Sequence, residues 1–146
     1  MKEYRSDSAE KTEEIAENFA KEILNSGREK AFLALFGGLG AGKTAFVRGF
    51  AEGMNSRSHV SSPTFAIMNQ YEGEKTIYHF DFYNIHSEED LYSTGFYDIM
   101  ENNGVYISEW SENIEYAIPA DSFIIRIELT GEDSRKITIS EGLDKV

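Results

Sequence analysis

The spacing of apolar residues predicts two helices in the first third of the chain. In residues 9–25, apolar side chains recur three and four positions apart, at Ile15, Ala16, Phe19, Ala20, Ile23 and Leu24. This spacing places them on one face of a helix, which would pack against a core. Residues 44–50 repeat the spacing on a smaller scale. Gly27 and Gly53 are expected to end the two helices, because glycine readily adopts the left-handed conformation found after a helix.

Short apolar or alternating runs between turn residues predict strands. Six segments have this character: residues 31–36, 64–71, 76–81, 104–108, 121–130 and 135–140. Residues 72–75 and 131–134 would join two pairs of them into hairpins, the last of which contains no recognisable catalytic residue and is expected only to extend the sheet. A short helix is expected after Ser87, in a near capping box with Asp90, and to continue to about residue 101. Residues 1–8 are expected to form a mobile or edge segment.

The composition is that of an ordinary globular protein with a single domain over residues 1–146, and 40% of its residues are hydrophobic. The absence of cysteine excludes a disulfide framework, a zinc–thiolate site and thiol catalysis. No apolar run approaches the roughly 18 residues that span a bilayer, and the first residues do not have the character of a signal peptide. We therefore expect a cytoplasmic protein with no membrane association.

The charge is strongly negative and unevenly distributed. The formal net charge is -12, from 26 acidic and 14 basic residues, which disfavours tight binding to a phosphate backbone. Residues 76–125 contain ten Asp and Glu but no Lys or Arg. Such a segment is either a solvated acidic face or a surface for a basic partner, and the charge pattern alone leaves both interpretations open.

The stretch from Gly37 to Thr44 fits the P-loop pattern G-x-x-x-x-G-K-[S/T]. An expected strand precedes it and an expected helix follows it, which is the context that the motif requires. Its glycines would bring backbone N–H groups close to a phosphate chain, and the start of the helix would add partial positive charge. Lys43 would reach the β- and γ-phosphates, and the hydroxyl of Thr44 would bind Mg²⁺. The alternative is a glycine-rich turn that binds nothing.

Several other residues are candidates because of their position next to expected strands. Asp81 ends one strand, as the magnesium-associated acid of P-loop enzymes does, and Glu109 and Trp110 follow another. Ser62-Pro63-Thr64 lies where loops that sense the γ-phosphate occur. His59, His79 and His86 have no metal-ligand spacing, and His79 is expected to be a core residue on its apolar strand.

Four motifs occur in one order: Leu39-Gly40-Ala41-Gly42-Lys43-Thr44, Ser62-Pro63-Thr64, His79-Phe80-Asp81-Phe82-Tyr83 and Glu109-Trp110. Together they resemble the bacterial TsaE (YjeE) family, small ATPases of tRNA threonylcarbamoyladenosine synthesis. The resemblance extends from Thr12 to the last hairpin. It implies a P-loop NTPase-like three-layer α/β sandwich with a mixed central sheet and flanking helices. It also implies ATP and Mg²⁺ as cofactors and hydrolysis of ATP.

The resemblance further implies a role for individual residues. Lys43 and Asp81 would be catalytic, and Thr44 and Glu109 would bind Mg²⁺. The nucleotide would contact Thr12, Gly38, Leu39, Gly40, Ala41, Gly42, Lys43, Thr44, Ala45 and Trp110. The implied partner is the two-protein threonylcarbamoyl-transferase complex of the TsaB–TsaD type, which acts on adenosine 37 of tRNA, so tRNA would be contacted only indirectly.

Three positions depart from the family pattern. Gly38 replaces a common Asp, Ala45 replaces a second Thr, and Asn84 replaces an Arg. The first two leave the backbone donors of the loop unchanged. The third removes a cation near the site, so we expect hydrolysis to be slow alone and to be stimulated by a partner. A small-molecule kinase and a nucleotide-dependent binding module without turnover are the alternatives. The kinase would need cations over the phosphoryl group, and no basic residue lies between Lys75 and Arg126.

Overall fold

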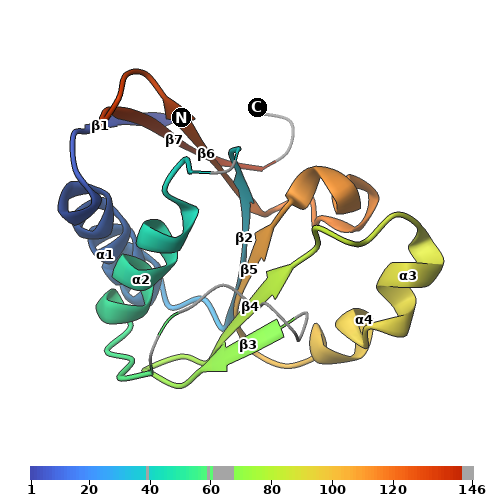
Figure 1. Cartoon of the computed structure of the whole chain (residues 1–146). Coiled ribbons are helices and arrows are strands. Elements are labelled where there is room, and N and C mark those ends of the chain that lie inside the picture. Colours follow the sequence, from blue (N-terminus) through green and yellow to red (C-terminus); the bar gives the residue numbers. More distant parts are fainter. Residues whose placement is uncertain (39, 59, 61–67, 143–146) are drawn as a thin grey trace.

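A mixed sheet of seven strands forms the centre of the computed structural model, which describes residues 1–38, 40–58, 60 and 68–142 (Figure 1). The strands are β1 (Lys2–Ser6), β2 (Lys30–Phe36), β3 (Met68–Tyr71), β4 (Ile77–Asp81), β5 (Gly104–Glu109), β6 (Phe123–Leu129) and β7 (Arg135–Glu141). The helices are α1 (Ala9–Asn25), α2 (Lys43–Gly53), α3 (Glu88–Ser93), α4 (Phe96–Ile99) and the 3₁₀ helix η1 (Ser111–Ala117). In the sheet the strand order is β1-β7-β6-β2-β5-β4-β3.

Strand β2 lies in the middle of the sheet. It pairs in parallel with β5 and β6, and β5 also pairs in parallel with β4. Antiparallel pairs complete the sheet on both sides, β6 with β7 and β7 with β1 on one side and β4 with β3 on the other. The predicted α/β fold with a mixed sheet is confirmed. Because β4 and β5 run in register, with Asp81 opposite Glu109, their carboxyl ends meet at the edge of the sheet where β2 also ends.

Helices cover both faces of the sheet, which gives the predicted three layers (Figure 1). Successive residues of β2 point to opposite faces, as the pleat requires. Leu33 joins the core that includes Phe46 of α2. Phe32 joins a second core that includes Phe96 of α4. After its exposed first residue, Lys30, the central strand is therefore apolar, because both of its sides are buried.

The contact between α1 and α2 explains two glycines of α2. A Cβ atom at Gly49 would lie 2.2 Å from the carbonyl oxygen of Glu13, and one at Gly53 would lie 2.5 Å from that of Glu17. Helix α2 ends at Gly53 as predicted, but Gly53 is its last helical residue, and the left-handed residue that follows the helix is Asn55, with φ 58°. These glycines allow the two helix backbones to approach each other, which hydrophobic spacing alone does not reveal.

The segment after β4 differs in part from its prediction. Ser87 caps α3 as expected, because its side chain accepts a hydrogen bond of 3.1 Å from the backbone N–H of Asp90. The helix does not continue to residue 101, since Gly95 adopts φ 82° and separates α3 from α4. The helix η1 was not predicted. It has an interior break at Ile114, so it offers no regular periodicity to detect.

The outer parts of the sheet follow the sequence predictions. Residues Lys2–Ser6 form an edge strand, β1, which pairs with β7. The expected strand at 64–71 is described only from Met68, since residues 64–67 lie outside the described part of the chain. No helix in the described residues has the length and apolar character needed to cross a membrane.

Candidate functional site

The loop between β2 and α2 has the backbone geometry that the motif predicts. Gly40 and Gly42 have φ values of 75° and 105°, which favour glycine. Within the loop, the N–H of Ala41 donates to the carbonyl of Gly38 at 3.2 Å. Gly42 is the N-cap of α2, and no side chain caps the helix there. The first turn of α2, from Lys43 on, thus presents its N–H groups at the end of the helix that favours anions.

Lys43 is buried next to the loop and lies against an aromatic ring. Only 7% of its surface is exposed, and its Nζ lies 4.7 Å from the centre of the Trp110 ring. Among the described residues it forms no salt bridge. Trp110 itself adopts a left-handed conformation with φ 58°, directly after Glu109, so the backbone turns sharply at this point. The half-buried Thr44 and the buried Ala45 follow on the first turn of α2.

Two carboxylates face the loop from the ends of adjacent strands. Asp81 ends β4 and is half-buried, while Glu109 ends β5 and is 5% exposed. Burial raises the pKa of Asp81 above its ordinary value, and the negative charge of Glu109 adds to this. The N–H of Tyr83, 2.9 Å from its Oδ1, lowers that pKa, as do His79 and Lys43. Lys43, Asp81 and Glu109 are thus close enough to influence one another.

His79 is buried, as the apolar strand predicts, but it also contacts the site. Its Nε2 lies 2.5 Å from Oε2 of Glu109, and its Nδ1 lies 3.0 Å from the hydroxyl of Tyr71. The sequence interpretation of a core residue is therefore correct for its burial and incomplete for its contacts. The partner is 30 residues away along the chain, so no local pattern indicates the contact.

The aromatic side chains next to the carboxylates form one wall of the site. The ring of Tyr83 meets that of Trp110 edge to face at 4.9 Å, and Tyr83 is 56% exposed. Behind them, the buried hydroxyl of Ser111 donates to the carbonyl of Leu35 at 2.9 Å. The same hydroxyl lies 2.6 Å from the hydroxyl of Ser108. Ser111 thereby ties the end of β5 to the end of β2. Sequence patterns gave no signal for it.

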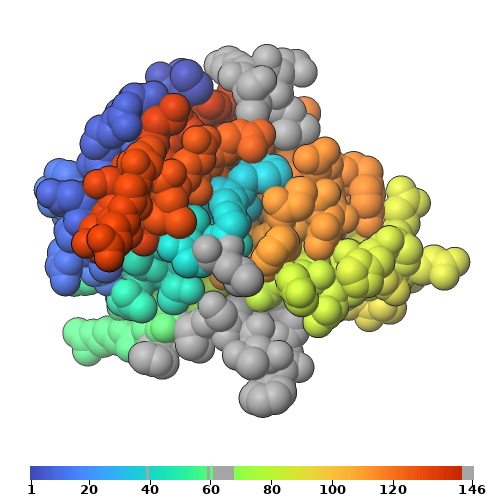
Figure 2. All heavy atoms as spheres, turned by 45° about the horizontal axis from the view of Figure 1, so that its top comes forward, coloured from blue at the N-terminus to red at the C-terminus, as the bar shows by residue number. Residues whose placement is uncertain are grey.

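The last hairpin carries a residue of the site that the sequence analysis missed. Arg135, at the start of β7, donates from Nε to the carbonyl of Ala41 at 2.8 Å and from Nη2 to that of Gly40 at 3.2 Å. The hairpin (red-orange) lies directly beside the cyan segment that includes the loop in Figure 2. The expectation that this hairpin only extends the sheet is therefore wrong. An arginine at a strand start has no distinctive pattern, so only the fold reveals its contact.

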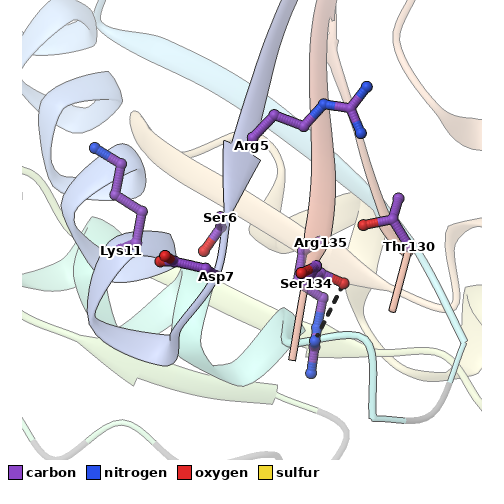
Figure 3. Close-up of a pocket in the computed structure, with 7 residues that line it drawn as sticks. All are labelled: Arg5, Ser6, Asp7, Lys11, Thr130, Ser134 and Arg135. Atoms are coloured by element: carbon purple, nitrogen blue, oxygen red, sulfur yellow. Dashed lines mark hydrogen bonds between the residues drawn. The ribbon is translucent and has the colours of Figure 1, made fainter. Parts of the chain in front are cut away.

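A hollow of about 610 Å³ opens beside the loop on the side of Arg135 (Figure 3). It is lined by Arg5, Ser6, Asp7, Lys11, Thr130, Ser134 and Arg135. Thr12 is buried behind this hollow, with its hydroxyl 2.8 Å from that of Ser6. The structure thus places Thr12 next to the hollow rather than beside the two carboxylates. Leu39, Ser62 and Thr64 lie outside the described residues.

Comparison with known proteins identifies the family. A family model described as "Threonylcarbamoyl adenosine biosynthesis protein TsaE" matches residues 6–137. The chain belongs to the TsaE family. The glycine loop, the two carboxylates and Arg135 all lie within the matched residues. The TsaE family is involved in the biosynthesis of threonylcarbamoyladenosine in tRNA.

Individual relatives and a solved structure agree with membership of the TsaE family. A TsaE protein of Bacillus subtilis is 42% identical over 110 residues, covering 74% of this chain and 68% of the relative. A TsaE protein of Treponema pallidum is 34% identical over 112 residues, covering 77% and 83%. The crystal structure of Bacillus subtilis YdiB is similar with a TM-score of 0.73 and 32% identity, covering 99% of this chain and 87% of that one.

Proposed function

We propose that the chain binds ATP at the loop between β2 and α2 and hydrolyses it in support of the threonylcarbamoylation of adenosine 37 in tRNA. The observation that carries the proposal is the convergence of Lys43, Asp81 and Glu109 at the start of α2. The relatives are named for the biosynthesis of threonylcarbamoyladenosine in tRNA, which supports the pathway.

The phosphate chain of ATP would lie along the loop. The left-handed conformations of Gly40 and Gly42 and the N-terminus of α2 favour an anion there. The buried ammonium of Lys43 would exchange its contact with the Trp110 ring for charge-assisted hydrogen bonds to phosphate oxygens. A Cβ atom at Gly38 would meet nothing within 4 Å, so the absence of the family's common Asp does not alter this cradle.

Mg²⁺ fits the oxygen donors at this site. Within the described residues, no group of three or more His, Asp or Glu side chains is placed to hold a metal ion. Mg²⁺ commonly uses only one or two carboxylates together with phosphates and water, which suits Asp81 and Glu109. Their mutual repulsion, which contributes to the raised pKa of Asp81, would be relieved by a cation. Glu109 and the Thr44 hydroxyl would hold the ion, which when bound neutralises charge on the β- and γ-phosphates.

The two carboxylates would act differently in hydrolysis. Glu109 is buried and already accepts a hydrogen bond from His79. Asp81 is half-exposed, and one of its oxygens accepts the N–H of Tyr83, which fixes the side chain. Asp81 is therefore the carboxylate that can contact and orient a water molecule arriving from solvent.

The nucleoside part of ATP would occupy the hollow in Figure 3. The hollow joins the phosphate loop through Arg135, whose guanidinium contacts two loop carbonyls. Thr130 and Ser134 line it and could form hydrogen bonds to a base or ribose through their hydroxyl groups, whereas the hydroxyl of Ser6 already donates to the carbonyl of Ser8 at 2.8 Å. The Thr12 hydroxyl would act there through Ser6.

A partner protein would complete the site. Asn84 is exposed where the family commonly has an arginine, and Lys43 is the lysine whose charge acts on Asp81. An arginine supplied by a partner is worth about 10³–10⁵ in kcat in related chemistry. We expect the two-protein threonylcarbamoyl-transferase complex of the TsaB–TsaD type to supply it. The net charge of -12 would keep direct contact with tRNA weak.

The surface that would meet this partner surrounds α3, α4 and η1. We call it the acidic face, and it consists of Glu88, Glu89, Asp90, Asp98, Glu112, Glu115, Tyr92, Tyr97 and Tyr116. Among the described residues, none of its carboxylates forms a salt bridge. A lid rich in arginine, as a small-molecule kinase needs, is absent from residues 76–125, so the kinase alternative is not favoured.

Measurement of ATP turnover with and without the transferase complex tests the proposal. We expect slow phosphate release from the protein alone, clear stimulation by the complex, and loss of both in Asp81→Ala. Asp121→Ala, which removes an exposed acid between η1 and β6, serves as the matched control and should behave like wild type. Fast turnover that no partner alters, or transfer of phosphate to a small-molecule acceptor, would show the proposal to be wrong.

A further inference from the structure

Three buried side chains from adjacent strands form a continuous hydrogen-bonded chain beneath the site. Tyr71 of β3 is 2% exposed, His79 of β4 is 0% exposed and Glu109 of β5 is 5% exposed. The hydroxyl of Tyr71 lies 3.0 Å from Nδ1 of His79, and Nε2 of His79 lies 2.5 Å from Oε2 of Glu109. Buried polar groups are commonly paired, so pairing alone does not require a function.

The chemistry of the Glu109 carboxylate determines which group donates the hydrogen bond between His79 and Glu109. An ionised carboxylate only accepts hydrogen bonds, so Nε2 of His79 must donate to Oε2 of Glu109. The other ring nitrogen, Nδ1, is within hydrogen-bond distance of the Tyr71 hydroxyl. The amide of Asn69 lies 3.5 Å from the same hydroxyl and can supply a hydrogen bond to its oxygen. Tyr71 thus fixes the orientation of the imidazole that donates to Glu109.

The strand register explains why Glu109 needs such a partner. Asp81 is opposite Glu109, and His79 lies two residues earlier on the same face of β4. The Glu109 carboxylate therefore lies between the like charge of Asp81 and the hydrogen-bond donor of His79. The bond to His79 occupies Oε2 and leaves Oε1 as the oxygen available for a cation. A carboxylate held in this way loses less conformational freedom when it binds a metal, because its orientation is already fixed.

We propose that His79, oriented by Tyr71, is a positioning residue that holds the Glu109 carboxylate ready for the metal ion of the bound nucleotide. This inference rests on the proposed function, because it assigns a metal to Glu109. It differs from a structural role in a measurable way. A residue needed only for packing affects stability, whereas a positioning residue affects metal affinity at constant nucleotide affinity.

Three variants separate the two roles. His79→Leu replaces the imidazole with an apolar side chain of moderate size and so removes both ring nitrogens. His79→Gln retains an amide donor that can reach the position of Nε2. Tyr71→Phe removes a single hydroxyl. Tyr106→Phe is the matched control, because it removes a buried hydroxyl on the opposite face of the sheet that donates to the carbonyl of Ile99 at 2.6 Å.

The readout is the affinity of Mn²⁺ for the protein–ATP complex, followed by electron paramagnetic resonance, with ATP affinity in EDTA measured by calorimetry. Loss of an outer partner of a metal ligand typically costs about tenfold to a hundredfold in metal affinity. We expect His79→Leu to show a loss of this size, Tyr71→Phe to show a smaller one, and His79→Gln to recover most of the affinity. ATP affinity in EDTA should stay within about twofold, and Tyr106→Phe should bind Mn²⁺ like wild type.

Each outcome decides between the alternatives. Wild-type Mn²⁺ affinity in His79→Leu, or an equal loss of ATP affinity in EDTA, would overturn the positioning role while leaving the proposed function intact. Absence of metal binding by the wild-type complex would instead overturn the proposed function, and the inference with it. If His79→Leu does not fold, Tyr71→Phe carries the test, and an affinity equal to that of Tyr106→Phe would refute the inference.

Discussion

At the level of single residues, the burial of the Lys43 ammonium bears on how this residue could bind a ligand. A buried ammonium is costly unless a partner compensates for its lost hydration. In the described structure the compensation comes from the face of the Trp110 ring, 4.7 Å away, a contact worth about 0.5–2 kcal/mol. Phosphate oxygens are stronger partners for an ammonium than an aromatic ring is. The residue is thus held in a position from which a phosphate chain can bind it.

Lys43→Ala should therefore weaken ATP binding far more than it changes the fold. We expect a loss of about tenfold or more in affinity, since a hydrogen bond to a charged group contributes about 1.5–3 kcal/mol. Calorimetry gives the affinity, and circular dichroism the fold. Trp110 is the only tryptophan of the chain, so its fluorescence should also change when ATP binds to the wild type. Arg48→Ala, which removes an exposed cation further along α2, is the matched control. Unchanged ATP affinity in Lys43→Ala would refute the assignment of the loop.

Asp81 leads to a prediction about pH. Its pKa is raised in the folded protein, mainly by burial, so the folded state binds a proton more tightly than the unfolded state does. Ionised Asp81 therefore destabilises the fold, and this destabilisation develops as pH rises from the ordinary value of 3.8 through the raised pKa. Asp81→Asn, whose amide oxygen can still accept the N–H of Tyr83, should unfold at a higher temperature than wild type at pH 7.

Thermal unfolding followed from pH 3 to pH 8 in metal-free buffer checks this prediction. The gain in melting temperature from Asp81→Asn should shrink as pH falls and disappear below the ordinary pKa of 3.8. Asp98→Asn, at an exposed position of α4, should show no such gain. A gain that grows on acidification would mean that ionised Asp81 stabilises the fold, contrary to its position beside Glu109.

At the level of elements, the contact between β7 and the glycine loop joins segments that are far apart in the chain. Arg135 and Ala41 are 94 residues apart, yet a hydrogen bond of 2.8 Å links them. A glycine-rich loop has high conformational freedom, and anchoring its carbonyls from outside reduces that freedom. The hairpin therefore acts as an external support for the conformation of the loop at the proposed phosphate site.

Arg135→Ala should weaken ATP binding by about tenfold, which corresponds to about 1.4 kcal/mol. The physical reason is the loss of two hydrogen bonds to the loop, whose carbonyls then lose their fixed partner. Lys136→Ala is the matched control, because Lys136 is the next residue of β7 and lies 3.8 Å from Glu3 instead. Calorimetric titration with ATP measures both variants. Equal affinities in the two would show that the loop holds its conformation without the hairpin.

Much of this arrangement could be predicted from the sequence because it is local. The helix over residues 9–25 has a strongly amphipathic pattern and a serine cap, and its bounds were predicted correctly. The strand before the loop, the cap at Ser87 and both hairpins also follow from neighbouring residues. The predicted motif residues Lys43, Asp81 and Glu109 come together because each ends a strand or begins the helix after one.

What the sequence did not reveal depends on pairings between distant segments. The contact of His79 with Glu109 requires the parallel register of β4 with β5. The role of Gly49 requires knowledge that α1 crosses α2 at that point, where a Cβ atom would overlap the backbone of Glu13. Periodicity reports which face of an element is buried, but it does not report what lies against that face.

At the level of the whole molecule, positive charge is unevenly distributed. The acidic face around α3, α4 and η1 contains no Lys or Arg, whereas α1, β1 and β7, on the other side of the molecule, carry both acidic and basic residues (Figure 1). Within the acidic face, Tyr92 and Tyr97 lie 6.4 Å apart and are 75% and 43% exposed. Burial, Tyr97 and the charges of Glu88 and Asp90 raise the pKa of Tyr116. Exposed tyrosines beside carboxylates offer both stacking and ion pairing to arginine.

Stimulation by the transferase complex should consequently depend on salt. Exposed charges are screened beyond about 10 Å at 0.1 M ionic strength, so stimulation should fall as salt rises. Reversal of charge in Glu88→Lys with Glu89→Lys should reduce stimulation while the basal turnover stays unchanged. The matched control, Glu10→Lys with Glu14→Lys on α1, should leave stimulation near the wild-type level. Stimulation that is insensitive both to salt and to these reversals would place the partner elsewhere.

The strand order also determines when the molecule can form during its synthesis. Strand β2 is made early, but its two neighbours, β5 and β6, are made only in the last third of the chain. Until they emerge, β2 has no strand to pair with, and β1 likewise has none until β7 is made. Sheets built from such distant pairings fold slowly and expose apolar surface while they do so. The nascent chain therefore needs protection from aggregation until synthesis is almost complete, because its central strand lacks both neighbours, and its first strand its only one, until the last third of the chain is made.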